Sequence, residues 1–157
     1  MEHGGAHAIH GSNLTRLAVS ATNHCLTGCV IGEVTGMFIA TALGWGDVAS
    51  IALAVGLAYV FGFSLTARPL VKARLAAATV ISTALAVDTL SITIMEVIDN
   101  VFVVLIPGAM EAGVDDPVIY ASIAGGFVIA YPFAFLANRY LIARGKGHAL
   151  VHEYHGH

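Results

Sequence analysis

Charged residues are scarce in this chain of 157 residues: Lys, Arg, Asp and Glu together account for 11% of it, and hydrophobic residues account for 57%. Soluble domains contain roughly 25% charged residues. The seven basic and ten acidic side chains are too few to cover the surface of a soluble domain of this size. The composition argues against a disordered chain, a nucleic-acid-binding protein and an ordinary soluble enzyme. It predicts an integral membrane protein in contact with the lipid bilayer.

Cysteine is also scarce, since the chain has only two. Cys25 and Cys29 lie four residues apart, so they cannot form the disulfide framework of a small secreted protein and do not match the Cys-x-x-Cys redox motif. The chain lacks a phosphate-binding glycine loop, a dinucleotide fingerprint and a nucleophile with an adjacent base. Its first 12 residues are mostly polar or small, which predicts no cleavable signal peptide. We therefore expect a membrane protein that is not an enzyme.

Four long apolar stretches take up most of the chain. A membrane-spanning helix needs about 20 mostly apolar residues. The predicted spans cover residues 17–43, 48–66, 75–106 and 118–142, and His-rich tails cover residues 1–15 and 143–157. The sequence therefore predicts a single membrane domain with an all-α fold, a four-helix transmembrane bundle.

The third stretch is longer than one crossing needs. As one straight helix, residues 75–106 would extend about 48 Å, whereas the hydrocarbon core of a bilayer is about 30 Å thick. We expect a single crossing whose outer end is extended or breaks near Asp99 and Asn100, ahead of Pro107 and Gly108.

The basic residues indicate the orientation in the membrane. All seven fall before the first stretch, between the second and third, or at the end of the fourth: Arg16, Arg68, Lys72, Arg74, Arg139, Arg144 and Lys146. Four crossings place these groups on one face, and Lys and Arg are enriched on the cytoplasmic face. We therefore expect a multi-pass protein of the bacterial inner membrane with both termini in the cytoplasm.

The first stretch carries both thiols and a carboxylate on one helical face. At about 100° per residue, Cys25, Cys29 and Glu33 fall within a sector of about 80°. His24 and Met37 border this sector. Thiolate and thioether ligands favour Cu(I) or zinc, and imidazole suits zinc and copper alike. Plain packing is the alternative for the thiols and the methionine.

The same face carries three glycines at four-residue spacing, Gly28, Gly32 and Gly36. Such a run lets another helix approach closely, because no Cβ stands in the way. The partner is either another helix of the bundle or a second copy of the chain. Four helices enclose only a narrow path, so we also expect a homo-oligomer.

The third stretch carries a second polar face. Its three carboxylates, Asp88, Glu96 and Asp99, fall within about 80°, beside Ser91 and Met95. An acidic residue at the centre of a membrane helix costs about 2.5 to 3.5 kcal/mol on insertion scales. Such residues face the bundle interior or a water-filled cavity and mark ion or proton paths. A structural role, such as bonding free backbone groups at a helix break, is the alternative.

The depths of two carboxylates can be compared. Glu33 and Asp88 lie about 24 and 20 Å from the cytoplasmic ends of their predicted helices. Both helices start from the same face of the membrane, so we expect that these two carboxylates could meet.

Histidine is concentrated outside the apolar stretches. Seven of the eight histidines lie in the two tails: His3, His7, His10, His148, His152, His155 and His157. His-rich tracts are typical of metal binding, and solvated tails without a bound ion are the alternative.

These ligand types together predict binding and translocation of a metal cation, with copper or zinc favoured, in which the carboxylates pass either the ion or a proton that moves in exchange. The predicted metal ligands lie on the first and third stretches: His24, Cys25, Cys29, Glu33, Met37, Asp88, Met95, Glu96 and Asp99. One alternative is a membrane scaffold or oligomerising subunit that transports nothing. Another is a redox protein that binds haem through His24 or reacts through its thiols.

Several short sequence motifs resemble those of a known family: residues 24–29 and 31–33 in the first stretch, 88–100 in the third, and 107–110 after it. With these motifs, the chain resembles a family of small bacterial membrane proteins classed only as a domain of unknown function. The likeness covers about Asn23 to His148. It implies a compact four-helix membrane domain and no particular activity.

Overall fold

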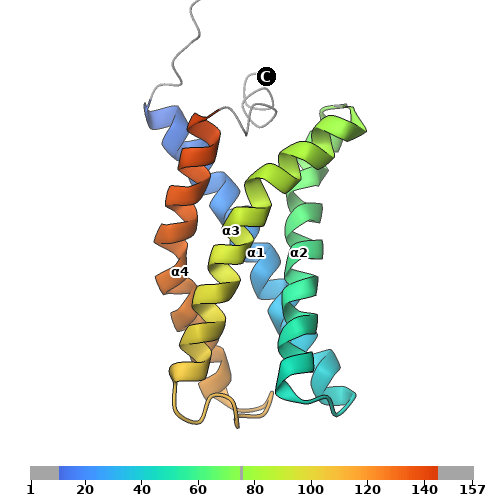
Figure 1. The fold of residues 1–157 in the computed structure, drawn as a ribbon, viewed down its shortest axis with the longest axis vertical. Coiled ribbons are helices and arrows are strands. Elements are labelled where there is room, and N and C mark those ends of the chain that lie inside the picture. Colours follow the sequence, from blue (N-terminus) through green and yellow to red (C-terminus); the bar gives the residue numbers. More distant parts are fainter. Residues whose placement is uncertain (1–10, 75, 145–157) are drawn as a thin grey trace, which may run out of the picture.

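The structure, a computed structural model, describes residues 11–74 and 76–144. They form four helices: α1 (Gly11–Ala42), α2 (Asp47–Lys72), α3 (Ala77–Leu105) and α4 (Pro117–Ala143). Successive helices run in opposite directions, so the start of α1 and the end of α4 lie at the same end of the bundle (Figure 1). The described residues contain no strand, and each helix is long and apolar enough to cross a membrane. The predicted all-α, four-helix architecture is confirmed.

Of the two alternatives for the outer end of the third stretch, an extended helix or a break near Asp99 and Asn100, the structure shows the extended helix. α3 is continuous through Asp99 and Asn100 and ends at Leu105, ahead of Pro107. The Asn100 amide donates a hydrogen bond to the Glu96 carbonyl at 2.8 Å, so this polar side chain bonds within its own helix instead of interrupting it. The 29 residues extend about 43 Å. The helix leans relative to its neighbours (Figure 1), as expected for a helix longer than the hydrocarbon core.

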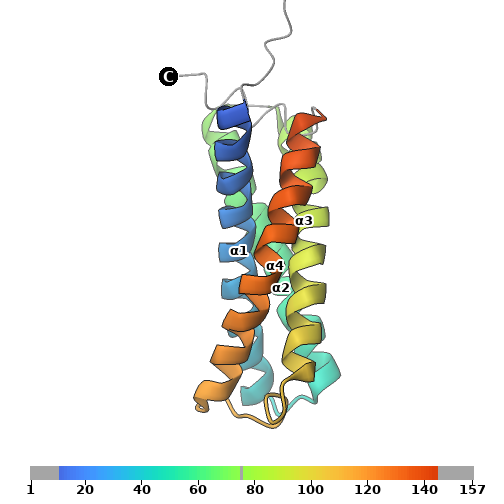
Figure 2. The same cartoon turned by 90° about the vertical axis from the view of Figure 1, so that its left-hand side faces the viewer.

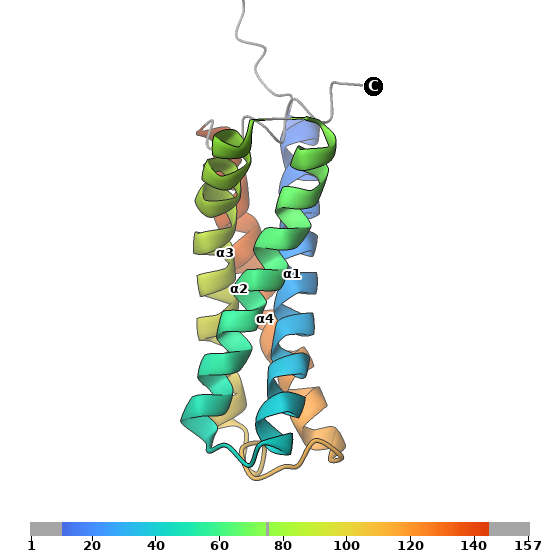
Figure 3. The same cartoon turned by 90° about the vertical axis from the view of Figure 1, so that its right-hand side faces the viewer.

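The four helices form two antiparallel hairpins. α1 packs most extensively on α2, and α3 packs most extensively on α4. Side views show the hairpins lying against one another along their length (Figures 2 and 3). α1 and α3 run in the same direction and sit diagonally, each between α2 and α4. Side chains from this diagonal pair therefore meet at the centre of the bundle.

The glycine run of α1 packs against α2. A Cβ built on Gly28 would lie 2.5 Å from the Cα of Gly62, and one on Gly32 would lie 2.2 Å from the nitrogen of Ala58. Gly36 meets Ala54 in the same way, at 2.5 Å. These distances leave no room for a side chain between the two backbones. Of the two predicted partners, the glycine face thus serves a helix of its own bundle.

Two connections close the end of the bundle opposite the start of α1. The short turn from α1 to α2 uses Gly44 at a φ of +66°, a conformation that glycine adopts at little cost. The longer loop from α3 to α4 ends at Asp116, whose side chain accepts a hydrogen bond from the Val118 N–H at 2.9 Å and caps α4. Tyr120 ties this loop to the helix by donating to the carbonyl of Val114.

Candidate functional site

The acidic and thiol side chains of α1 and α3 face one another at the centre of the bundle. Three interacting pairs follow one another along its axis: Cys25 with Asp88, Cys29 with Glu96, and Glu33 with Asp99. We call these six residues the polar ladder, and its pairs the inner, middle and outer rungs. All six are buried, and the most exposed, Glu33, is 8% exposed. The ladder extends about 16 Å along α3, roughly half the thickness of the hydrocarbon core.

At the inner rung, Asp88 of α3 accepts hydrogen bonds from side chains of α1 and α2. Cys25 Sγ donates to Asp88 Oδ1 at 3.3 Å, and Thr66 Oγ1 of α2 donates to the same oxygen at 2.9 Å. Asp88 Oδ2 has no hydrogen-bond partner among the described residues. Sequence reasoning missed Thr66, whose only signal is a hydroxyl within an apolar stretch.

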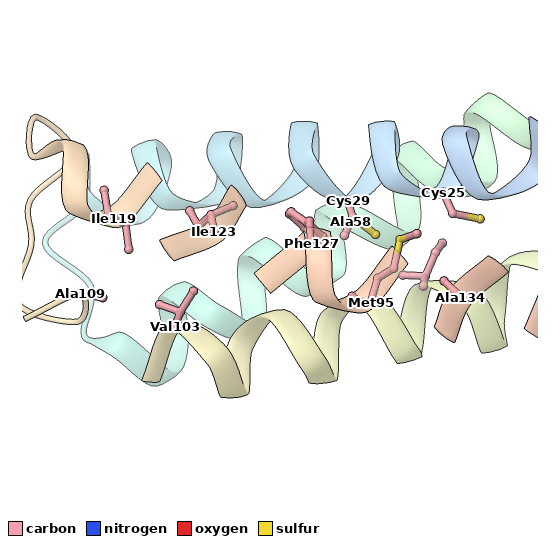
Figure 4. Packing of buried hydrophobic residues seen from close by; sticks show 12 residues of the cluster. Cys25, Cys29, Ala58, Met95, Val103, Ala109, Ile119, Ile123, Phe127 and Ala134 are labelled. Atoms are coloured by element: carbon pink, nitrogen blue, oxygen red, sulfur yellow. The ribbon is translucent and has the colours of Figure 1, made fainter. Parts of the chain in front are cut away.

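The middle rung combines soft and hard ligand types. The Cys29 thiol interacts with the Glu96 carboxyl group. The Asn100 amide lies 3.5 Å from Glu96 Oε2, while Glu96 Oε1 has no partner among the residues described. Met95 belongs to the same buried cluster as both cysteines and extends toward α1 (Figure 4). A thiol, a thioether and a carboxyl group are thus brought together at this depth.

The outer rung places two carboxyl groups against each other. Glu33 and Asp99 interact directly, yet Glu33 Oε2 and both oxygens of Asp99 have no hydrogen-bond donor in the described part of the chain. Gly126 of α4 makes room for them, because a Cβ there would lie 2.1 Å from Asp99 Oδ1. Two carboxylates cannot remain charged side by side in a buried site without a proton or a cation between them.

A pocket of about 170 Å³ opens at the outer rung. It lies between the two connections that close this end, and its lining includes Glu33, Met37, Asn100 and Met110. Trp45 and Asp47 line it from the turn between α1 and α2. The pocket therefore leads from the end of the bundle to the first carboxyl group of the ladder.

Positive charge in the described part of the chain lies toward the opposite end. Its six basic residues occupy the first turns of α1, the last turns of α2 and α4, and the ends of the adjoining connections: Arg16, Arg68, Lys72, Arg74, Arg139 and Arg144. Arg16 is 17 residues from Glu33 on the same helix, a distance of about 25 Å. Among the residues that the structure describes, none with a basic side chain lies at the depth of the outer rung to offset its charge.

The expectation that Glu33 could meet Asp88 is wrong. Glu33 lies two turns beyond Cys25, which is the residue of α1 that meets Asp88. Eight residues move a side chain about 12 Å along the axis, and at that level α3 presents Asp99. The error came from taking the start of each apolar stretch as the membrane boundary, because the two helices are offset along the bundle.

The remaining predicted ligands lie in different places. Met37 is half-buried and lines the pocket, whereas His24 is half-buried next to Cys25. Within residues 11–74 and 76–144, no three His, Cys, Asp or Glu side chains are grouped so that they could hold one metal ion. The seven histidines of the tails lie outside the described residues. Metal binding by the nine predicted ligands therefore stays a prediction.

Sequence reasoning also missed the contribution of α4. Asn138 is fully buried, and its amide donates to Thr22 Oγ1 at 3.0 Å and to Ser91 Oγ at 3.1 Å. An amide within the fourth apolar stretch was the available signal, because a buried polar group in a membrane helix needs partners. Gly126 gave no such signal, since its role depends on the position of Asp99 on another helix.

Four membrane-spanning helices around the buried polar ladder define a small multi-pass membrane protein with a polar core. The family model described as "Domain of unknown function (DUF4396)" matches residues 15–147, and the chain belongs to this family. This confirms the family resemblance drawn from the sequence. No match is found among curated proteins or among solved structures.

Proposed function

We propose that this protein binds a metal cation in the core of its bundle and moves it across the membrane. The observation that carries the proposal is the polar ladder, in which five carboxyl oxygens are buried without a hydrogen-bond partner among the described residues. Buried charges are costly unless they are paired. A cation is the missing partner that would offset these carboxylates, and moving along the ladder would bring it to one carboxyl group after another.

The pocket supports a route to the ladder. It connects the outer end of the bundle with Glu33, the first carboxyl group of the outer rung. Toward the other end, the middle and inner rungs continue the line of acidic groups to Asp88, which lies about 17 Å from the start of α3. A proton moving in exchange would occupy the carboxyl groups that the cation leaves.

The ligand chemistry favours copper or zinc as the ion. Cys29 interacts with Glu96 at the middle rung, Met95 lies in the same buried cluster as Cys29, and Met37 lines the pocket. Thiolate and thioether groups select Cu(I) and zinc over hard ions such as magnesium. These ligands would hold the copper or zinc ion in the bundle.

The setting of the proposal is the bacterial inner membrane, with both termini in the cytoplasm. The basic residues at one end of the bundle support this orientation, which makes the pocket face the outside. A homo-oligomer also belongs to the proposal. Its contacts would use helix faces other than the glycine run, which α2 already covers.

Flux of Zn²⁺ or Cu(I) into proteoliposomes tests the proposal. Asp99→Asn keeps the shape of the side chain and removes its charge, so it should abolish most of the flux while the protein still folds. Glu111→Gln, in the exposed α3–α4 loop, is the matched control and should transport normally.

Three results would contradict the proposal. Wild-type vesicles without flux above empty ones, combined with altered assembly of Asp99→Asn, would indicate a scaffold. A haem absorption band in the purified protein would indicate a redox role. Normal flux in Asp99→Asn would mean that the ion does not pass along the polar ladder.

A further inference from the structure

A second polar cluster surrounds the inner rung and draws on all four helices. Its members are nearly or completely buried, none more than 4% exposed: Thr22 and Cys25 of α1, Thr66 of α2, Asp88 and Ser91 of α3, and Asn138 of α4. Asn138 of α4 donates to Thr22 and Ser91, which lie three residues from Cys25 and Asp88 on α1 and α3, so the α4 amide lies within one turn of the inner rung. We call these six residues the inner cluster. Polar groups so deeply buried need partners, because no water is available to replace them.

The hydrogen bonds of Thr22 fix the orientation of the Asn138 amide. The Thr22 hydroxyl donates to the Ala18 carbonyl at 2.7 Å, so its oxygen is left to accept. It accepts from Asn138 Nδ2, and the same nitrogen also donates to Ser91 Oγ. Both N–H groups of Asn138 are therefore engaged, and the carbonyl oxygen, Oδ1, remains buried without a partner among the described residues.

Asp88 shows the same one-sided pattern. Its Oδ1 accepts hydrogen bonds from Thr66 and Cys25, whereas Oδ2 accepts none from the described residues. One buried cluster thus holds two unpartnered oxygens, one from a carboxyl group and one from an amide. Hydroxyl groups bond the other polar atom of each side chain: Thr66 bonds Asp88 Oδ1, and Thr22 and Ser91 bond Asn138 Nδ2.

From this arrangement we infer that the inner cluster is a binding site for a hard monovalent cation of the sodium class. Carboxylate, amide carbonyl and hydroxyl oxygens are the ligands that hard cations prefer. The cluster has a single carboxyl group, so a monovalent ion neutralises it, whereas a divalent ion would leave a net positive charge in the membrane. Cys25 donates to Asp88 and so keeps its proton in this arrangement, which leaves the oxygens as the ligands.

The inner cluster differs from the middle rung in the ion that it suits. The middle rung offers a thiol and the nearby Met95 thioether to a soft ion, while the inner cluster offers oxygens to a hard one. The inference goes beyond the proposed transport of copper or zinc, because a sodium ion can bind here whether or not any ion crosses the membrane.

Thermal unfolding of the purified full chain in detergent tests the inference. An ion that binds only the folded state raises the midpoint of unfolding as its concentration rises. We expect a higher midpoint in sodium chloride than in choline chloride of the same ionic strength. Ser91→Ala removes one ligand and should weaken the apparent sodium affinity by roughly tenfold. Asp88→Asn removes the charge and should abolish the sodium effect.

Ser122→Ala is the matched control, because Ser122 is also a buried serine but donates to Val118 within its own helix. It should keep the full sodium effect. Equal midpoints in sodium and choline would overturn the inference, as would a full sodium effect in both Ser91→Ala and Asp88→Asn. If zinc flux persists without any sodium effect, this inference alone fails. Sodium stabilisation without zinc or copper flux would refute the transport proposal alone.

Discussion

The inner and outer rungs of the polar ladder place carboxyl groups in contrasting surroundings. At the inner rung, Asp88 Oδ1 receives two hydrogen bonds and lies within a cluster built by all four helices. At the outer rung, Glu33 and Asp99 have carboxyl oxygens without a donor from the described residues, and Glu33 lines a pocket. Hydrogen bonds to a carboxylate offset its charge. The hydrogen bonds at the inner rung therefore favour a charged carboxylate there, and under the proposed function the outer rung would exchange a cation or proton with the pocket.

The largest expected effect separates the two thiols. Cys29→Ser should weaken Zn²⁺ or Cu(I) binding by more than about a hundredfold, since losing even an indirect partner of a metal costs ten- to a hundredfold. Cys25→Ser should weaken binding far less, because serine can still donate to Asp88. Titration with a competing chelator measures both affinities. Binding through a thiolate releases a proton and should strengthen as the pH rises. Equal losses in the two variants would contradict the distinction between the rungs.

The outer rung can be disturbed alone through Gly126. In Gly126→Ala the new Cβ would lie 2.1 Å from Asp99 Oδ1 and 2.9 Å from its Cα. We expect a loss of about 1–3 kcal/mol in the free energy of unfolding, as for other overpacked sites, together with loss of metal flux. In Gly56→Ala, the control, a Cβ would meet nothing within 4 Å, so stability should stay or rise. A stable and fully active Gly126→Ala protein would show that α4 does not constrain Asp99.

The inner rung can be weakened through α2. Thr66→Val removes the hydroxyl that donates to Asp88 at 2.9 Å and keeps the side-chain volume. We expect the free energy of unfolding to fall by about 1 kcal/mol, the net value of a typical hydrogen bond. Thr83→Val changes another buried threonine, outside the inner cluster, and serves as control. Denaturant unfolding in detergent gives both values. An equal loss in both variants would mean that Thr66 contributes only as a packing residue.

Labelling tests which rung faces the outside, with almost no expected effect on stability. A single cysteine at Ala112, in the loop near the pocket, should react with an impermeant thiol reagent applied to intact cells. One at Ala73, at the other end of the bundle, should react only after the cells are opened. The native thiols are buried and should stay silent. The reverse pattern would place the outer rung toward the cytoplasm.

The sequence allowed the four helices and most of the ladder to be predicted. Apolar stretches of sufficient length predicted the spans, and helical periodicity placed Cys25, Cys29 and Glu33 on one face. The pairing across the bundle was beyond this reasoning, because periodicity gives the direction of a side chain but not the offset between two helices. Glu33 was therefore matched with Asp88 instead of Asp99.

The contributions of α2 and α4 were harder to predict for a different reason. Thr66 and Asn138 are single polar residues in apolar surroundings, and their importance depends on contacts with Asp88 and Ser91 on another helix. Nothing within their own stretches distinguishes them from hydroxyl or amide groups that bond their own helix. Ser122 is an example of the latter, since it donates to Val118 one turn earlier.

The glycine contacts between α1 and α2 have a consequence for how the bundle could open. Because the two backbones touch at Gly28, Gly32 and Gly36, the α1–α2 hairpin is expected to behave as one rigid body. An opening motion would then separate it from the α3–α4 hairpin. The acidic and thiol groups lie on the facing sides of the two hairpins, on α1 and α3, so they would separate as well. A cross-link within the α1–α2 hairpin should leave ion flux intact, whereas a cross-link between α1 and α3 should stop it.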